Sequence, residues 1–266
     1  MLISVITVTF NSRRYLEETI TGVLCQEYGD LEYILVDGGS TDGTLDIIRS
    51  HAATDSRVRW VSEPDGGISD AFNKGIRMAR GEIVGIINSD DTYTPGALRL
   101  VAEAFAMHPD SDVVHGDMIR FQGETPLFRL TPAPVDGRIW YDMPLNHPAT
   151  FVRRQAYDRA GLYDTGLKVA MDYDMVLRLY RAGCRFHRIN GVLARMRYGG
   201  ASDERFLAAR REVYAVTVAA GYPRWKAGLR FLQKTLLNMT KNLLRRLGLH
   251  ALIRLHPKFR KYQDGV

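Results

Sequence analysis

Cysteine is scarce in this 266-residue sequence, and long apolar runs are missing from it. The two cysteines, Cys25 and Cys184, are far apart and have no neighbouring Cys or His at metal-ligand spacing, which excludes a disulfide framework. A reducing, cytoplasmic setting fits this composition best. No segment is apolar for long enough to span a bilayer, and the N-terminal residues lack the basic leader of a signal peptide. We therefore expect a protein that is soluble or lies on a membrane surface.

Three motifs of common enzyme classes are also missing. No G-x-G-x-x-G follows a predicted strand and no G-x-x-x-x-G-K-[ST] is present, which argues against a nicotinamide-type Rossmann enzyme and a P-loop NTPase. A serine nucleophile elbow is absent as well. The sequence is 45% apolar and 25% charged, which is typical of a globular protein. Its length allows one large α/β domain with an appendage, or two small domains.

Acidic residues are almost absent from the C-terminal part. Residues 213–266 contain 11 Lys and Arg and one acid, Asp264, whereas residues 1–212 have a net charge of −4. At helical spacing, this part has one apolar face and one basic face. The apolar face consists of Leu229, Leu232, Leu236, Leu243 and Leu247, and the basic face of Arg230, Lys234, Lys241 and Arg245. This profile predicts an in-plane helix that binds an anionic membrane surface through residues 213–263. The alternative is a helix packed on its own domain with a solvated basic face. Nucleic acid is not expected as a partner, because aromatic residues are not interleaved with the cations.

Strand-like and helix-like segments alternate in the first half of the chain. Strands are expected at residues 3–9, 32–36, 58–61 and 83–87, and helices at residues 15–24, 45–51 and 68–79. Short connections in this order predict right-handed crossovers and a parallel sheet.

Polar residues follow three of these strands where the strands end. Thr9 and Asn11 follow the first, Asp37 the second, and the pair Asp90 and Asp91 the fourth. The carboxyl ends of parallel strands meet at one edge of the sheet, where open α/β sheets bind ligands. Two adjacent carboxylates at this edge are suited to a divalent cation and the polar part of a nucleotide. A plain helix-capping or turn role is the structural alternative.

The second half is less regular. A helix is expected over residues 95–107, with Thr94 as its N-cap and Pro95 at its first position. A strand at residues 113–118 precedes an irregular excursion or hairpin with three prolines. A short strand near residues 146–152 and a helix near 154–160 follow, and another helix begins at Met171, with Asp172 and Asp174 in its first turn.

Five segments together resemble a family 2 glycosyltransferase, the nucleotide-diphospho-sugar transferase type with the GT-A fold. They are residues 5–11 (VITVTFN), 36–44 (VDGGSTDGT), 65–75 (DGGISDAFNKG), 88–91 (NSDD) and 171–173 (MDY). The resemblance covers residues 2–202, and the order of the motifs makes it specific. It implies an α/β, Rossmann-like fold with a mixed, mainly parallel sheet flanked by helices. We expect a domain at 1–205, with a nucleotide-sugar half (1–110) and an acceptor half (111–205), and a membrane-associating helical tail at 206–266.

The resemblance also implies roles on the donor side. Asp37 corresponds to the carboxylate that hydrogen-bonds the donor base, a role that suits a strong acceptor. The backbone around Thr7, Thr9 and Asn11 is expected to line the nucleotide. Asp65 and Lys74 match the second nucleotide-side loop of the family.

The metal site of the family corresponds to residues 88–91. Asp91 is expected to ligate Mn²⁺ or Mg²⁺ between the two phosphates, with Asp90 nearer the ribose. The sequence departs from the family's D-x-D element here, because Asn88 or Ser89 replaces its first acid.

On the acceptor side, Asp172 corresponds to the catalytic base, although Met171 stands where many members have Glu. His147 lies in an N-H-P-A-T-F pattern found in some members and is expected to contact the diphosphate, the metal or the acceptor, unless it is structural. The Gly-rich turn at residues 197–202 is a candidate for closure over the phosphates, or a plain loop.

The sequence therefore predicts an inverting, metal-dependent glycosyltransferase that uses a nucleotide-diphosphate sugar. We expect a lipid-linked or glycan acceptor in bacterial surface polysaccharide or glycolipid synthesis, at the cytoplasmic face of the inner membrane. A sugar-1-phosphate nucleotidyltransferase and a catalytically silent, membrane-docked nucleotide-sugar-binding protein are the alternatives. The former should carry a Gly-rich basic loop after the first strand, where this chain has T-F-N-S.

Overall fold

The computed structural model of the chain describes residues 1–198 and 206–246. The strands are β1 (Ile3–Thr9), β2 (Leu31–Asp37), β3 (Val58–Ser62), β4 (Ile83–Ile86), β5 (Thr92–Tyr93), β6 (Val113–Gln122), β7 (Thr125–Leu130), β8 (Thr150–Arg153) and β9 (Phe186–Arg197). The helices are α1 (Leu16–Leu24), α2 (Thr44–Thr54), α3 (Ile68–Met78), α4 (Ala97–Met107), α5 (Arg154–Ala160), α6 (Met171–Arg181), α8 (Phe206–Ala219) and α9 (Arg224–Arg246), with short 3₁₀ helices η1 (Arg138–Trp140) and η2 (His147–Ala149).

The strands form one mixed sheet in the order β3-β2-β1-β4-β8-β6-β9-β5, and β7 pairs with β6. The first four strands in this order are parallel, and β8 joins them antiparallel to β4. Thr9 is paired with Asp37, and Asp37 with Ser62, so the ends of three strands lie level. This confirms the predicted mixed α/β sheet and its polar carboxyl edge.

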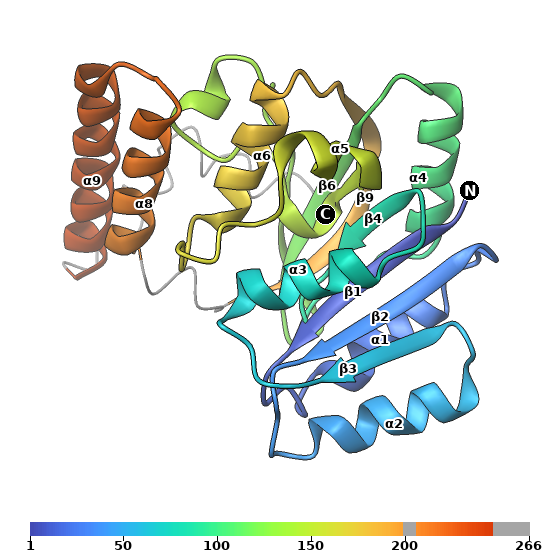
Figure 1. The fold of residues 1–266 in the computed structure, drawn as a ribbon. Coiled ribbons are helices and arrows are strands. Elements are labelled where there is room, and N and C mark those ends of the chain that lie inside the picture. Colours follow the sequence, from blue (N-terminus) through green and yellow to red (C-terminus); the bar gives the residue numbers. More distant parts are fainter. Residues whose placement is uncertain (199–205, 247–266) are drawn as a thin grey trace.

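Helices cover both faces of the sheet, and this explains the apolar runs of the central strands. All seven residues of β1 and all seven of β2 are buried. Successive side chains point to opposite faces. Ile6 and Val8 pack with α3 and α6 in one core cluster, whereas Ile3 and Val5 pack with α1 and α4 in the other (Figure 1).

The expected helix start at Pro95 is wrong by two residues. α4 begins at Ala97, and Gly96, with φ 74°, is its N-cap. Thr94 does not cap the helix because its hydroxyl donates to Val192 O at 2.6 Å and its amide donates to Leu193 O at 3.0 Å. These bonds continue the short pairing of β5 with β9, which local sequence does not signal.

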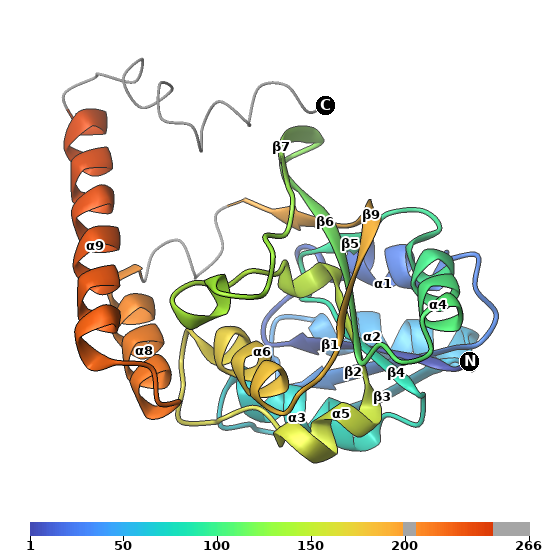
Figure 2. The ribbon, with the colours of Figure 1, turned by 90° about the horizontal axis from the view of Figure 1, so that it is seen from above.

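The C-terminal helices α8 and α9 form an antiparallel pair beside the sheet domain. α8 lies between α9 and α6 in both views (Figures 1 and 2). No helix among residues 1–198 and 206–246 is both long enough and apolar enough to cross a membrane. The part of the expected membrane-associating tail at residues 247–266 lies outside the described residues.

Candidate active site

The carboxyl edge of the sheet brings together the ends of β1, β2 and β3. Asn11, with φ 50°, links two of them: its side-chain Oδ1 accepts from Thr41 N at 3.0 Å, and its amide donates to Ser40 Oγ at 2.8 Å. Thr7 is not at this edge. Its side chain is fully buried, and its Oγ1 accepts from the Tyr33 hydroxyl at 3.1 Å. Only the backbone of this residue is left for the expected contact with a nucleotide.

Asp37, at the end of β2, is fully buried and holds the loop that follows it. Its two oxygens accept from the hydroxyls of Thr9, Ser40 and Ser62 at 3.0, 2.5 and 2.7 Å and from the amides of Gly39 and Ser40, both at 3.0 Å. Burial alone would raise the pKa of Asp37, but these bonds outweigh it and lower the pKa. The carboxylate is therefore charged and supplied with five protein donors.

The carboxylate of Asp65 lies close to this loop and is more open than that of Asp37. A Cβ added to Gly38 would stand 2.6 Å from Asp65 Oδ2 and 3.4 Å from Phe10 Cδ2, so glycine at this position lets these two side chains lie close to the backbone. Phe10 is 66% exposed. Within the described residues, Asp65 uses only Oδ1 in a hydrogen bond, from Gly67 N at 2.8 Å. Phe10 was not predicted as a site residue, although a large aromatic residue directly after a buried strand was the available signal.

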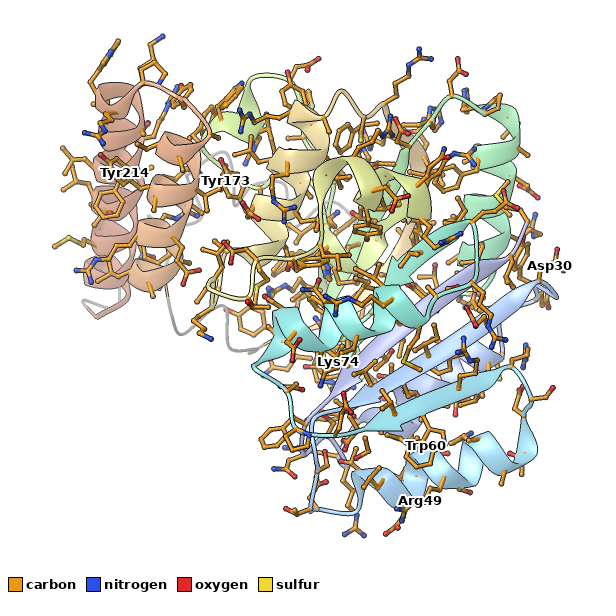
Figure 3. The ribbon with its side chains drawn as sticks, in the orientation of Figure 1. Asp30, Arg49, Trp60, Lys74, Tyr173 and Tyr214 are labelled. Atoms are coloured by element: carbon orange, nitrogen blue, oxygen red, sulfur yellow. The ribbon has the colours of Figure 1, made fainter. Side chains whose placement is uncertain are left out.

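Lys74, labelled on α3 in Figure 3, holds this second loop in place. Its ammonium group donates to Pro64 O at 2.9 Å and lies 3.0 Å from Glu63 and 3.7 Å from Asp70. The loop that carries Asp65 is thus fixed on both sides.

Asp90 and Asp91 follow β4 at the same edge. Asp91 is only 1% exposed; its Oδ1 accepts from Arg197 N at 3.0 Å and its Oδ2 from Asn88 Nδ2 at 3.4 Å. The Thr19 hydroxyl donates to Asp91 O at 2.8 Å and fixes the turn. Burial first, and the charge of the adjacent Asp90 second, raise the pKa of Asp91 to about 7. Burial also raises the pKa of Asp90.

These two acids fit a hard divalent cation. They offer carboxylate oxygens, which Mg²⁺ and Mn²⁺ prefer, and the raised pKa of Asp91 reports a buried negative charge that a cation would stabilise. Among the described residues, no group of three or more His, Cys, Asp or Glu side chains is arranged to hold a metal by itself. A cation held here would therefore complete its shell with substrate oxygens and water, as Mg²⁺ commonly does.

Asp172 and His147 form a second cluster. Asp172 is the second residue of α6, and its Oδ1 lies 3.4 Å from His147 Nε2. This oxygen is buried and has no hydrogen-bond donor within the described chain, while the side chain as a whole is 32% exposed. Burial raises the pKa of Asp172, and the nearby His147 opposes this rise. Tyr163, which the sequence did not indicate, places its hydroxyl 3.4 Å from the same His147 nitrogen.

The two clusters flank β4. His147 packs on Phe72 of α3, with ring centroids 5.6 Å apart. Together with Ile86, the last residue of β4, His147 lines a small cavity of about 20 Å³. Asp90 and Asp91 follow Ile86 by four and five residues, so the acids on both sides belong to one edge. Of the predicted turn at 197–202, Arg197 and Tyr198 are described, and residues 199–202 lie outside the described range.

Comparison with known proteins agrees with this arrangement. The sequence profile described as Glycosyl transferase family 2 matches residues 4–171. The chain belongs to this family. A PGL/p-HBAD biosynthesis glycosyltransferase of Mycobacterium bovis is 33% identical over 181 residues, which are 67% of this chain and 70% of the relative. Chondroitin synthase of Escherichia coli is 30% identical over 203 residues, 72% of this chain but 28% of the synthase. As a family 2 member, the chain is a glycosyltransferase, as predicted.

Solved structures show that this family 2 glycosyltransferase has the predicted GT-A type of fold. S. aureus TarS 1-349 in complex with UDP superposes with a TM-score of 0.65 at 23% identity, over 87% of this chain and 70% of that one. Mannosyltransferase PcManGT from Pyrobaculum calidifontis, in complex with GDP-Man and Mn²⁺, gives a TM-score of 0.68 at 20% identity, over 98% and 82% of the two chains.

Proposed function

We propose that the protein is an inverting glycosyltransferase that transfers a sugar from a nucleotide diphosphate to a lipid-linked acceptor in surface polysaccharide or glycolipid synthesis. One observation carries the proposal: Asp90 and the buried Asp91 follow β4, and Asp172 lies 3.4 Å from His147, which lines a cavity together with Ile86 at the end of the same strand. The first cluster suits a diphosphate with its cation, and the second suits proton removal. The names of two relatives, a PGL/p-HBAD biosynthesis glycosyltransferase and a chondroitin synthase, support such a setting.

We place the donor base between Phe10 and Asp65. The exposed ring of Phe10 offers an apolar surface, and Asp65 Oδ2 is an acceptor for an N–H group of the base. Asp37 is satisfied by five donors, so in this proposal it holds the loop under the base. This assigns the expected base contact to Asp65 instead of Asp37.

Asp91, with Asp90 beside it, would hold the divalent cation. When bound, this cation would supply Lewis-acid stabilisation to the departing nucleoside diphosphate. Asp91 is kept in place by the amide of Arg197, whose guanidinium donates to Glu18 at 2.7 Å and lies 3.9 Å from the ring centre of Tyr15. The end of β9 is thereby attached to the donor side.

Asp172 acts as the general base toward the acceptor hydroxyl. Its raised pKa makes it a stronger base than a solvated carboxylate, and a base with a pKa nearer the working pH transfers protons more effectively. His147 Nε2 lies 3.4 Å from its Oδ1. The acceptor oxygen attacks the anomeric carbon from the face opposite the diphosphate, so the sugar is transferred with inversion.

We further propose that α9 attaches the enzyme peripherally to the cytoplasmic face of the inner membrane. One stripe of this helix is apolar and more than half exposed, and it consists of Trp225, Leu229, Leu232, Leu236 and Met239. Lys234 and Arg230 lie on another side, where Lys234 bonds Asp142 at 2.6 Å and Arg230 covers the Tyr141 ring at 4.5 Å. An exposed apolar stripe of this length suits the interfacial region of a bilayer.

The deciding experiment compares Asp172→Asn with Asp174→Asn, a matched change in the same turn of α6. Asp172→Asn should keep the fold and the affinity for the nucleotide sugar but lose about 10²-fold to 10⁴-fold in transfer rate. Asp174 pairs with Arg178 at 2.8 Å and should matter mainly for stability. Full turnover by Asp172→Asn would refute the assignment. Release of pyrophosphate would instead indicate a nucleotidyltransferase.

A further inference from the structure

The start of α6, which carries Asp172, is capped from another part of the chain. Glu212 of α8 accepts three backbone hydrogen bonds from the segment just before the helix. Its Oε1 accepts from Lys168 N at 3.1 Å, and its Oε2 accepts from Val169 N at 2.8 Å and Ala170 N at 2.7 Å. The partners are 42 to 44 residues apart in the sequence, so this is a tertiary contact.

α6 has no capping side chain of its own. Its N-cap residue, Ala170, makes no side-chain hydrogen bond to the helix. The amides at and before a helix start need partners, and a carboxylate there bonds them strongly and interacts favourably with the helix dipole. Asp172 follows Ala170 by two residues, so Glu212 fixes the backbone that sets the position of the Asp172 side chain.

A second contact from α8 holds α6 on the other side of Asp172. The Tyr173 hydroxyl donates to Ile139 O at 2.6 Å and lies 3.2 Å from Thr217 Oγ1. Tyr173 is 3% and Thr217 2% exposed. Figure 3 shows Tyr173 between α6 and α8. Residues 168–170, which end two positions before Asp172, and Tyr173, directly after it, are therefore both held by α8.

We propose that Glu212 is a positioning residue for the general base, and that α8 belongs to the catalytic apparatus of this enzyme. The inference rests on the proposed role of Asp172. Glu212 does not contact the substrate; it holds residues 168–170 so that Asp172 stands beside His147 and faces the acceptor. Loss of the carboxylate frees three amides at the helix start and lets the first turn of α6, with Asp172, move.

The test uses the full chain with Glu212→Ala and Glu212→Gln, and Arg211→Ala as the control, because Arg211 is the exposed neighbouring residue on α8. A displacement of about 1 Å at a catalytic group costs on the order of 10²-fold in rate. We expect Glu212→Ala to lower kcat by about 10-fold to 100-fold with the dissociation constant of the nucleotide sugar unchanged within about twofold. Glu212→Gln keeps one carbonyl acceptor and should recover part of kcat. The acid limb of the pH–rate profile should also shift in Glu212→Ala, since the surroundings of Asp172 change.

Hydrogen exchange supplies a readout that does not depend on activity. The amides of Lys168, Val169 and Ala170 should exchange at least about tenfold faster in Glu212→Ala than in the wild type, while those of the central sheet stay protected. Faster exchange with unchanged kcat and pH profile would refute the positioning role. A parallel loss of kcat, donor affinity and sheet protection would also refute it, as a global structural effect. If instead Asp172→Asn retains full turnover, the proposed function itself fails, whatever the Glu212 variants show.

Discussion

Replacing Asp91 by Asn should stabilise the metal-free protein at neutral pH and remove its response to a divalent cation. Asp91 is buried beside Asp90, and its pKa is raised from 3.8 to about 7. The folded state therefore binds a proton that the unfolded state releases, so this contribution to stability is present in acid and is lost as the pH rises toward 7. The total difference of about three pKa units corresponds to about 4 kcal/mol, and more than half of it falls between pH 5 and pH 8.

The side chain at position 91 is uncharged throughout this pH range in the Asp91→Asn variant, so the variant does not lose this contribution to stability as the pH rises. The new amide can still accept from Arg197 N, and Asn88 Oδ1, which is buried without a partner in the described structure, is available as an acceptor for the new N–H₂. The difference in melting temperature between variant and wild type should grow by about 5–10 °C between pH 5 and pH 8, at about 2–4 °C per kcal/mol for a chain of this size.

Thermal unfolding at several pH values, with and without Mn²⁺ and a nucleoside diphosphate, measures both effects. The wild type should gain stability from the bound cation by mass action, and the variant should not. Asp46→Asn in α2 is the control, because the side chain of Asp46 is 82% exposed. A difference between variant and wild type that stays flat from pH 5 to pH 8 would refute the reasoning on burial. An equal response to Mn²⁺ in both would remove Asp91 as the ligand.

Three further predictions test the other parts of the site. Asp65→Asn should weaken nucleotide binding about tenfold in a calorimetric titration, since a hydrogen bond to a charged group is lost. Asp37→Asn should instead mainly lower the melting temperature. The reverse pattern would return base recognition to Asp37. His147→Gln removes a group that lowers the pKa of Asp172, so the acid limb of the pH–rate profile should move to higher pH, and a move to lower pH would contradict the pairing. Replacing both Leu232 and Leu236 by Ser should reduce flotation with anionic vesicles; equal partition with the wild type would exclude α9 as the docking surface.

The sheet and its edge were predictable because their signals are local. β1 and β2 are buried on both faces, and such strands read as continuous apolar runs. α5 was expected near residues 154–160 and spans Arg154–Ala160. The start of α4 was not predictable in this way. Threonine is a favoured N-cap residue, but the hydroxyl of Thr94 donates to the backbone oxygen of Val192, 98 residues later.

Within the site, the sequence located the acids but not their partners. Asp37, Asp91 and Asp172 follow strand or helix boundaries that can be read from the residues around them. Which acid is open to a ligand depends on contacts between distant loops. The five donors of Asp37 come from three strand ends, and the approach of Asp65 to Gly38 requires β2 and β3 to be paired. Such pairings are set by the assembled sheet.

The C-terminal helices give the clearest case in which packing changes the meaning of a pattern. Residues 206–266 were expected to form a membrane-associating tail, an in-plane helix with an apolar face and a separate basic face whose cations lie near an anionic leaflet. In the described part, Lys234 instead bonds Asp142 of the domain, and the leucine stripe of α9 is the exposed side. α8 connects this helix to α6: its Tyr214, labelled in Figure 3, faces Phe231 of α9 at 6.2 Å between ring centroids.

In the proposed function, a membrane that binds the apolar stripe of α9 is joined through packed helices to Asp172, the proposed general base. α9 packs on α8, and Glu212 of α8 caps the helix that carries Asp172. If α9 lies in the plane of a bilayer, the height of Asp172 above that plane is set by this connection. Membrane attachment then restricts which hydroxyl of a lipid-linked acceptor reaches the base. The same acceptor presented in detergent or as a free glycan should consequently be used with a lower kcat/KM, even where the donor affinity is unchanged.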